Sequence, residues 1–206
     1  MNLPNKITLT RICMIPVFVA VFYCGLVSEW CYLAAAGVFL LAASTDAIDG
    51  HIARSRHLVT DLGKFLDPIA DKVLVSTALI LMLTVPVPFT VRPFESCGLI
   101  VAGICVALIL ARELIVGGLR MIAAGKKVVL AADKLGKIKT TMQDAAIALL
   151  LASMPFLLSA NANLALAGRI LAYIGLACFV LCTLFTLISG INYLVKNRSV
   201  FGSEEQ

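Results

Sequence analysis

The most informative stretch of this sequence for fold and function is residues 46–72, which read D-A-I-D-G-H-I-A-R-S-R-H-L-V-T-D-L-G-K-F-L-D-P-I-A-D-K. Asp46 and Asp49, three residues apart, end one apolar run, and Asp67 and Asp71, four residues apart, begin the next. Spacings of three and four place both members of each pair on one face of a helix. Because the loop between the runs reverses the chain, we expect two antiparallel helices whose four carboxylates meet at one end.

The apolar runs on either side of this stretch belong to a chain suited to a membrane. Of its 206 residues, 61% are hydrophobic and 14% are charged, and the mean hydropathy is +1.00. Soluble domains average about 25% charged residues, so soluble, disordered and disulfide-stapled classes are excluded. A spanning helix needs about 20 mainly apolar residues. Six uncharged runs reach that length once their polar ends are included, at Ile12–Val27, Trp30–Thr45, Val73–Val91, Ser96–Ala111, Ala145–Gly168 and Ile170–Val195.

These runs predict an all-α polytopic membrane protein with six transmembrane helices and a short N-terminal juxtamembrane segment. We expect one membrane domain over residues 1–206, with residues 1–11 as that segment and residues 200–206 as a flexible tail. Six spans place both termini on one side, together with the second and fourth loops. Of the 17 Lys and Arg residues, all but Arg92 and Arg169 fall there, which makes it the cytoplasmic side. The net charge of +5 reflects this topology and contact with anionic membrane lipids, not a nucleic-acid partner.

Four carboxylates at the edge of a membrane need compensation. Each costs about 2.5–3.5 kcal/mol near hydrocarbon on insertion scales, and crowded carboxylates repel one another. Three solutions are open: protonation, as in a proton-coupled transporter, pairing with Arg54, Lys64 or Lys72, or two bound divalent cations. Ligand sets made only of carboxylates favour Mg²⁺ or Mn²⁺, whereas Zn²⁺ favours His or Cys. His51 and His57 lie off the aspartate face and are expected to be bystanders.

Small residues accompany the aspartates. Gly50 follows Asp46 by four residues, Gly63 precedes Asp67 by four, and Ala53 continues the same face. A missing side chain lets a ligand approach the helix backbone closely. Close packing between membrane helices is the alternative explanation for each glycine. Their place beside four aspartates favours a bound ligand.

The pattern resembles the signature of the CDP-alcohol phosphotransferase family, with every fixed position filled. Its positions are Asp46-x-x-Asp49-Gly50-x-x-Ala53-Arg54, then eight residues, then Gly63-x-x-x-Asp67-x-x-x-Asp71. Similarity to the bacterial branch of this family that makes phosphatidylglycerophosphate extends over nearly the whole chain. The segments that carry it are Pro4-Asn5-x-x-Thr8-x-x-Arg11, Phe65-Leu66-Asp67-Pro68, Ala70-Asp71-Lys72, Arg112-Glu113 and Gly136-Lys137-Ile138-Lys139-Thr140.

The resemblance implies an enzyme that transfers a phosphatidyl or similar group from a CDP-linked donor to an alcohol and releases CMP. Asp46, Asp49, Asp67 and Asp71 would surround two divalent cations, Mg²⁺ or Mn²⁺, that bridge the donor diphosphate. Asp71 is also the expected general base for the incoming hydroxyl. The residues that would shape the donor pocket are Gly50, Ala53, Arg54 and Gly63. A homodimer in a bacterial cell membrane is implied as well.

Similarity to the bacterial branch implies CDP-diacylglycerol as donor and glycerol 3-phosphate as acceptor. The acceptor phosphate needs fixed cations, for which the candidates are Arg112, Lys137 and Lys139, together with Thr140. The alternative for each cation is ordinary charge on the cytoplasmic side. Weaker candidates, for contact with the donor or a headgroup, are Asn5, Thr8 and Arg11.

Two other functions remain open at this level. A sibling enzyme with the same aspartates would use another acceptor, such as inositol phosphate or phosphatidylglycerol, which gives cardiolipin. A cation transporter would use the aspartates as its ion site, although such sites more often lie near the membrane midplane on broken helices. Metal-dependent release of CMP distinguishes the enzyme from the transporter.

The charge distribution predicts that the loop after residue 54 is cytoplasmic. Ser55→Cys, in a background without native cysteines, should not react with an impermeant thiol reagent added to intact cells. The same variant should react after the cells are permeabilised. Efficient labelling of intact cells would invert the topology and separate the aspartates from cytosolic nucleotide.

Overall fold

The computed structural model describes the backbone of residues 3–55, 61–125 and 134–196. It describes the side chains of residues 9–45, 69–121 except Asp71 and Arg120, and 136–196 except Lys137. This backbone is all-helical, as predicted, and contains no strand. The helices are α1 (Leu3–Cys24), α2 (Cys31–Ser55), α3 (Asp61–Thr84), the 3₁₀ turn η1 (Val87–Phe89), α4 (Gly98–Gly125), α5 (Lys134–Leu158) and α6 (Ala162–Lys196).

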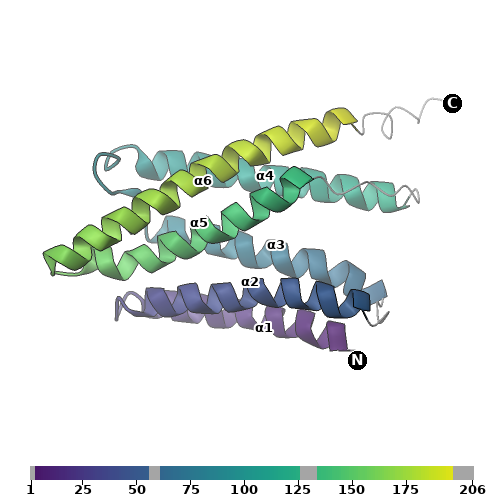
Figure 1. Cartoon of the computed structure of the whole chain (residues 1–206), viewed down its shortest axis with the longest axis horizontal. Coiled ribbons are helices and arrows are strands. Elements are labelled where there is room, and N and C mark those ends of the chain that lie inside the picture. Colours follow the sequence, from purple (N-terminus) through teal and green to yellow (C-terminus); the bar gives the residue numbers. More distant parts are fainter. Residues whose placement is uncertain (1–2, 56–60, 126–133, 197–206) are drawn as a thin grey trace.

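The helices run back and forth along the long axis of the molecule (Figure 1). α1 packs against α2 and α3, and α4 packs against α3 and α6. α5 lies along α6 and also contacts α2, so it joins the two sets of helices. The alternation places the end of α2, the start of α3 and the end of α4 at the same end of the bundle, whereas α5 begins closer to its middle (Figure 1).

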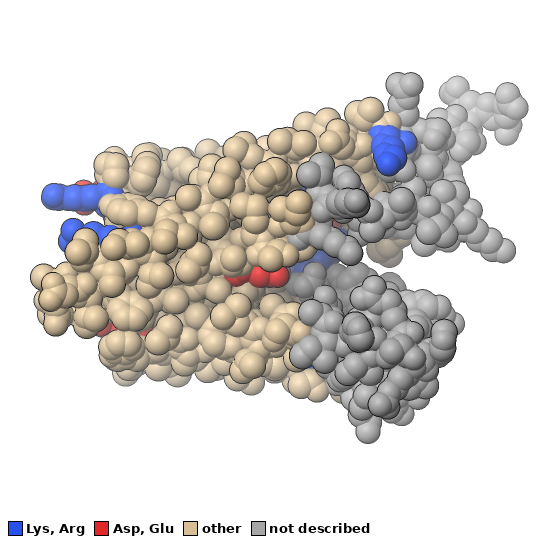
Figure 2. Space-filling model, viewed as in Figure 1, with Lys and Arg blue, Asp and Glu red and all other residues tan. Residues whose placement is uncertain are grey.

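Three helices of the described chain are long and apolar enough to cross a membrane, at Gly98–Leu119, Ile138–Leu158 and Ala162–Lys196. The apolar parts of the other three are shorter, at Leu9–Cys24, Cys31–Thr45 and Lys72–Thr84. In hydrocarbon the backbone must satisfy its own hydrogen bonds, which a helix does within one segment. Figure 2 shows a face whose described part is mostly uncharged, apart from an acidic patch near its middle and a few basic side chains. Six crossings stay a prediction.

The boundary between the last two helices differs from the predicted one. The uncharged runs place a break at Arg169, but α5 ends at Leu158 and Arg169 lies exposed inside α6. Asn161 provides the start signal, because its Oδ1 accepts the backbone N–H of Asn163 at 3.0 Å and so caps α6. A helix of 35 residues is about 50 Å long and exceeds the roughly 30 Å hydrocarbon core. An arginine near its end therefore fits outside the hydrocarbon core.

The predicted juxtamembrane segment is not a separate element in the described chain. α1 begins at Leu3 and continues without interruption to Cys24, so residues 3–11 form its first turns. Arg11 on this helix is only 1% exposed. The predicted tail at residues 200–206 lies outside the described residues.

Aromatic side chains fill the core between α1 and α2. The rings of Phe18 and Phe39 are 6.1 Å apart, and Phe22 meets Tyr32 edge-on at 5.4 Å. All four side chains are almost completely buried. Ring pairs at these distances add roughly 0.5–1.5 kcal/mol each beyond the burial of their area. They hold the helix that carries the first two aspartates against its neighbour.

Glycine permits a close approach between α5 and α6. A Cβ atom placed on Gly168 would lie 2.7 Å from the backbone N of Leu157 and 2.8 Å from the backbone C of Phe156. These are backbone atoms of the preceding helix, so they cannot yield as a flexible side chain would. The α5–α6 hairpin therefore depends on the absence of a side chain at Gly168.

We expect Gly168→Ala to lower the free energy of unfolding by about 1–3 kcal/mol, because the new methyl group overpacks this contact. The measurement is thermal unfolding in detergent micelles, followed by circular dichroism. Gly103→Ala is the matched control, since nothing lies within 4 Å of its added Cβ. Equal melting temperatures for the two variants would contradict this account of the hairpin.

Candidate functional site

The four aspartates lie on two helices that pack against each other. Asp46 and Asp49 are in α2, and Asp67 and Asp71 are in α3. The end of α2 and the start of α3 are at the same end of the bundle (Figure 1), and the two helices are in contact. The aspartate side chains lie outside the described residues. Their convergence and their roles as ligands and base stay predictions.

The residues predicted to bind the CDP-linked donor lie on the same two helices. Gly50, Ala53 and Arg54 are in the last turns of α2, and Gly63 is in the first turn of α3. Their surroundings lie outside the described residues, so the donor pocket also stays a prediction. Asn5 and Thr8 are in α1, and their side chains lie outside the described residues as well.

The chemistry of the donor set fits hard divalent cations. The residues available at the ends of α2 and α3 offer carboxylate oxygens, which Mg²⁺ and Mn²⁺ prefer. Elsewhere, the described side chains contain no group of three or more His, Cys, Asp or Glu that could hold a metal ion.

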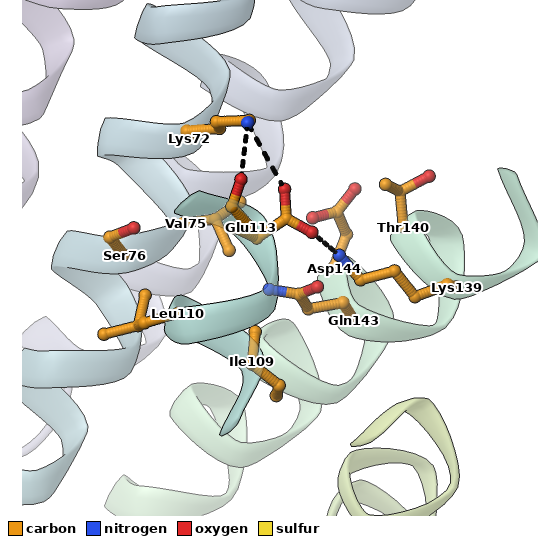
Figure 3. Close-up of a pocket in the computed structure, with 10 residues that line it drawn as sticks. All are labelled: Lys72, Val75, Ser76, Ile109, Leu110, Glu113, Lys139, Thr140, Gln143 and Asp144. Atoms are coloured by element: carbon orange, nitrogen blue, oxygen red, sulfur yellow. Dashed lines mark hydrogen bonds and ion pairs between the residues drawn. The ribbon is translucent and has the colours of Figure 1, made fainter. Parts of the chain in front are cut away.

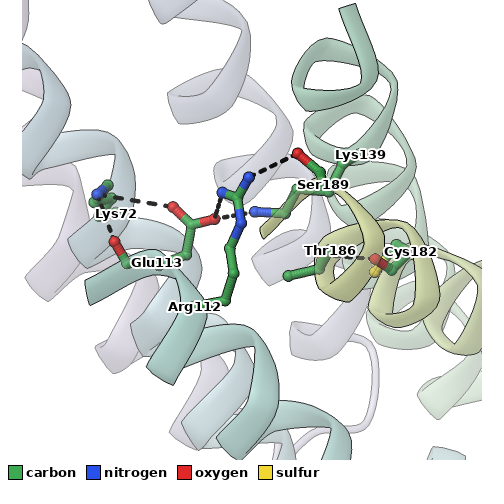
Figure 4. Close-up of polar contacts among 7 residues, drawn as sticks. All are labelled: Lys72, Arg112, Glu113, Lys139, Cys182, Thr186 and Ser189. Atoms are coloured by element: carbon green, nitrogen blue, oxygen red, sulfur yellow. Dashed lines mark hydrogen bonds and ion pairs between the residues drawn. The ribbon is translucent and has the colours of Figure 1, made fainter. Parts of the chain in front are cut away.

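The best-defined polar site in the described chain is an ion-pair cluster around Glu113 of α4 (Figures 3 and 4). Lys72 of α3 donates to the backbone oxygen of Glu113 at 2.9 Å and lies 3.8 Å from its Oε2. Arg112 donates from Nη1 to Oε1 at 3.0 Å, and Lys139 of α5 also donates to Oε1. One carboxylate thus joins three cations from three helices.

Arg112 extends the cluster to a fourth helix. Its Nη2 donates to Oγ of Ser189 in α6 at 2.9 Å (Figure 4). Gly190 leaves space for the arginine stem, since a Cβ atom there would lie 3.0 Å from Cγ of Arg112. The guanidinium is therefore fixed between Glu113 and Ser189, with its side chain 13% exposed.

A cavity of about 30 Å³ lies beside this cluster, between α3, α4 and α5 (Figure 3). The helix α5 contributes four polar side chains in two pairs spaced by four, Lys139 with Gln143 and Thr140 with Asp144. That spacing places each pair on one helix face. The residues that line the cavity are Lys72, Val75, Ser76, Ile109, Leu110, Glu113, Lys139, Thr140, Gln143 and Asp144.

The structure brings together part of the predicted acceptor set. Arg112 and Lys139 meet at Glu113, and Thr140 lines the adjoining cavity. Lys137 is in α5, and its side chain lies outside the described residues. Arg11 is buried in α1 and does not line this cavity.

Sequence reasoning missed several residues of this site. The sequence indicates Lys72 only as a possible ion-pair partner of the aspartates, and Glu113 only as the residue next to Arg112. The i, i+4 spacing of Lys139 and Thr140 with Gln143 and Asp144 is a signal that identifies the polar face of α5. The contacts of Lys72 with Glu113 have no signal in the sequence, because 41 residues separate the partners.

The cluster presents cations to an anion between the helices of the bundle. Lys72, Arg112 and Lys139 carry three positive charges, and Glu113 and Asp144 carry two negative ones. Lys139 is 2% exposed, so its charge acts where water screens it weakly. Arginine and lysine together provide the directional donors and the point charges that hold phosphate groups.

Comparison with known proteins adds independent information. The model of the family described as CDP-alcohol phosphatidyltransferase matches residues 1–189. A Bacillus subtilis protein named CDP-diacylglycerol–glycerol-3-phosphate 3-phosphatidyltransferase is 40% identical, with 95% of each chain covered. An Escherichia coli K12 protein of the same name is 36% identical, with 96% of each covered. A rice protein named cardiolipin synthase (CMP-forming) is 36% identical over 88% of this chain and 55% of its own length.

Proposed function

This chain belongs to the CDP-alcohol phosphatidyltransferase family, and on that premise we propose that it transfers the phosphatidyl group of CDP-diacylglycerol to glycerol 3-phosphate. The products are phosphatidylglycerophosphate and CMP. The observation that carries the choice of acceptor is the cation cluster of Lys72, Arg112 and Lys139. The names of the Bacillus subtilis and Escherichia coli relatives support the same acceptor.

The place of the cluster on the helices supports an acceptor site. Lys72 follows Asp71 directly in α3, so the proposed general base and a cation of the cluster are neighbours in one helix turn. Glycerol 3-phosphate has its phosphate at one end and its reacting hydroxyl at the other. A phosphate held by Lys72 and Lys139 would keep that hydroxyl within the reach of Asp71. Arg112 supplies a third cation, fixed from α6 by Ser189.

In this proposal the chain's own residues transfer a proton and bind the charged groups of the acceptor. Asp71 takes the proton of the acceptor hydroxyl as its oxygen bonds to the phosphatidyl phosphorus, and the bond from that phosphorus to the CMP oxygen breaks. Lys72, Arg112 and Lys139 hold the acceptor phosphate throughout. Asp46, Asp49, Asp67 and Asp71 would hold two divalent cations, Mg²⁺ or Mn²⁺, which when bound neutralise the donor diphosphate and the departing CMP.

The proposed setting is a bacterial cell membrane with the aspartate end in the cytoplasm. Six helices would then cross the bilayer, with both termini cytoplasmic. This arrangement keeps the acyl chains of the donor in lipid while its cytidine and the acceptor stay in water. The long apolar helices and the bacterial relatives support the membrane location. A homodimer is proposed from the family resemblance.

Phosphatidylglycerol is the second acceptor to consider, because the rice relative is named as a cardiolipin synthase. Its phosphate is a diester with one charge, whereas glycerol 3-phosphate carries a monoester with nearly two at neutral pH. A site with three cations favours the more highly charged group. Turnover with each acceptor, measured on purified protein with CDP-diacylglycerol and followed by lipid product, decides between them.

Substitution of a cation of the predicted acceptor set should weaken binding of the acceptor more than binding of the donor. Arg112→Gln, Lys137→Gln and Lys139→Gln each remove a hydrogen bond to a charged group, worth about 1.5–3 kcal/mol, so kcat/KM for glycerol 3-phosphate should fall roughly ten- to a hundredfold. KM for CDP-diacylglycerol should change little. Lys127→Gln is the control, because Lys127 lies between α4 and α5 in the sequence and outside the acceptor set. If it were as harmful as Lys139→Gln, general surface charge would explain the effect.

Activity should require a divalent cation. Excess chelator should abolish CMP release, and Mg²⁺ or Mn²⁺ should restore it, because four carboxylates need compensation at a membrane edge. Asp49→Asn or Asp67→Asn should lose nearly all turnover while inserting and folding normally, as judged by yield and melting temperature. Full turnover in chelator would refute the role assigned to the aspartates.

A further inference from the structure

Glu113 has the wrong charge for a site that binds a phosphate. Its carboxylate occupies the centre of the cation cluster and lines the same cavity. A negative charge there repels an anionic acceptor and weakens binding if electrostatics alone is considered. Its presence therefore calls for a role that outweighs this cost.

The contacts of Glu113 suggest that role. Its Oε1 is shared by Arg112 and Lys139, while its backbone oxygen and Oε2 face Lys72 (Figure 4). These cations come from α3, α4 and α5, and they would repel one another without a shared counter-charge. Glu113 thus fixes where the three positive charges lie relative to each other and, through Lys72, relative to the helix of Asp71.

Gly117, one turn beyond Glu113 in α4, completes this arrangement. A Cβ atom placed there would collide with Nζ of Lys72, so the glycine provides the space in which the ammonium lies against α4. The colliding atom is the tip of a flexible side chain and can move away at little packing cost. Gly118 next to it has nothing within 4 Å of an added Cβ. The two glycines therefore form a matched pair for substitution.

We propose that Glu113 and Gly117 position the acceptor-binding cations: Glu113 gathers Lys72, Arg112 and Lys139, and Gly117 admits the ammonium of Lys72 beside the α4 backbone. In this proposal neither residue holds the acceptor phosphate itself, and both act through the cations. The proposal rests on the proposed function, since it specifies how that acceptor pocket is assembled. It also explains why a carboxylate is present in an anion site.

The role of Glu113 is tested by whether its substitution raises or lowers KM for glycerol 3-phosphate. Glu113→Gln should raise KM for glycerol 3-phosphate roughly tenfold, because the cations lose their common partner, while KM for CDP-diacylglycerol stays within about twofold. Glu113→Asp, which keeps the charge on a shorter side chain, should recover part of the loss. Glu95→Gln is the control, because Glu95 pairs with Arg92 at an exposed position outside the cluster. A lower or unchanged acceptor KM in Glu113→Gln would overturn the proposal.

The glycine pair tests the position of Lys72 without removing any charge. Gly117→Ala should raise the acceptor KM about threefold to tenfold, and Gly118→Ala should leave it unchanged. Both variants should keep the wild-type melting temperature, which shows that any difference is local. Equal effects of the two substitutions, or equal losses for donor and acceptor, would reduce the role to a structural one and overturn the proposal.

Turnover of the wild-type enzyme distinguishes failure of the positioning proposal from failure of the proposed function. If it releases CMP with glycerol 3-phosphate but the acceptor KM is insensitive to Glu113 and Gly117, only the positioning proposal fails. If it shows no turnover with glycerol 3-phosphate and uses phosphatidylglycerol instead, the proposed function fails and the positioning proposal fails with it.

Discussion

The interaction on which the described site depends is the contact between the carboxylate of Glu113 and cations of three different helices. Lys72, Arg112 and Lys139 converge there from α3, α4 and α5, and Ser189 extends the cluster to α6. Isolated charges cannot be placed in an apolar bundle without heavy cost, so each must find a partner. One carboxylate that serves three cations satisfies this requirement and simultaneously fixes how four helices sit relative to one another at this level of the bundle.

Helix packing places this cluster where the proposed reaction needs it. Two apolar contacts set how the helices pack. One is the aromatic core between α1 and α2, and the other is the glycine contact between α5 and α6. The cluster lies where α3, α4, α5 and α6 come together (Figure 4), and the predicted donor aspartates are near the end of α2 and the start of α3. In the proposed reaction one substrate is a membrane lipid and the other a water-soluble alcohol, so the site must be reached from both phases.

The names of the relatives show that members of this family use different acceptors. The bacterial relatives are named for glycerol 3-phosphate, and the rice relative is named for cardiolipin synthesis. In the proposed mechanism the aspartates on α2 and α3 serve the donor, which the two reactions would share. In the same proposal the acceptor would be chosen mainly by α4 and α5, whose side chains line the cavity together with residues of α3. Differences in specificity should therefore be concentrated in those two helices.

The sequence alone determined the helical fold, the aspartate signature and the family, because each depends on local pattern: apolar length, residue spacing and fixed motif positions. It also singled out Arg112 and Lys139 as candidates, since charges beside apolar runs are conspicuous, and the structure brings these two residues together at Glu113. It misplaced the boundary of the last two helices, because Arg169 interrupts the hydrophobic run without ending the helix. The partnership of Lys72 with Glu113 and the need for space at Gly117 were decided only by the tertiary structure. Both depend on how α3 and α4 are rotated and packed, and no spacing within one helix encodes that relation between two.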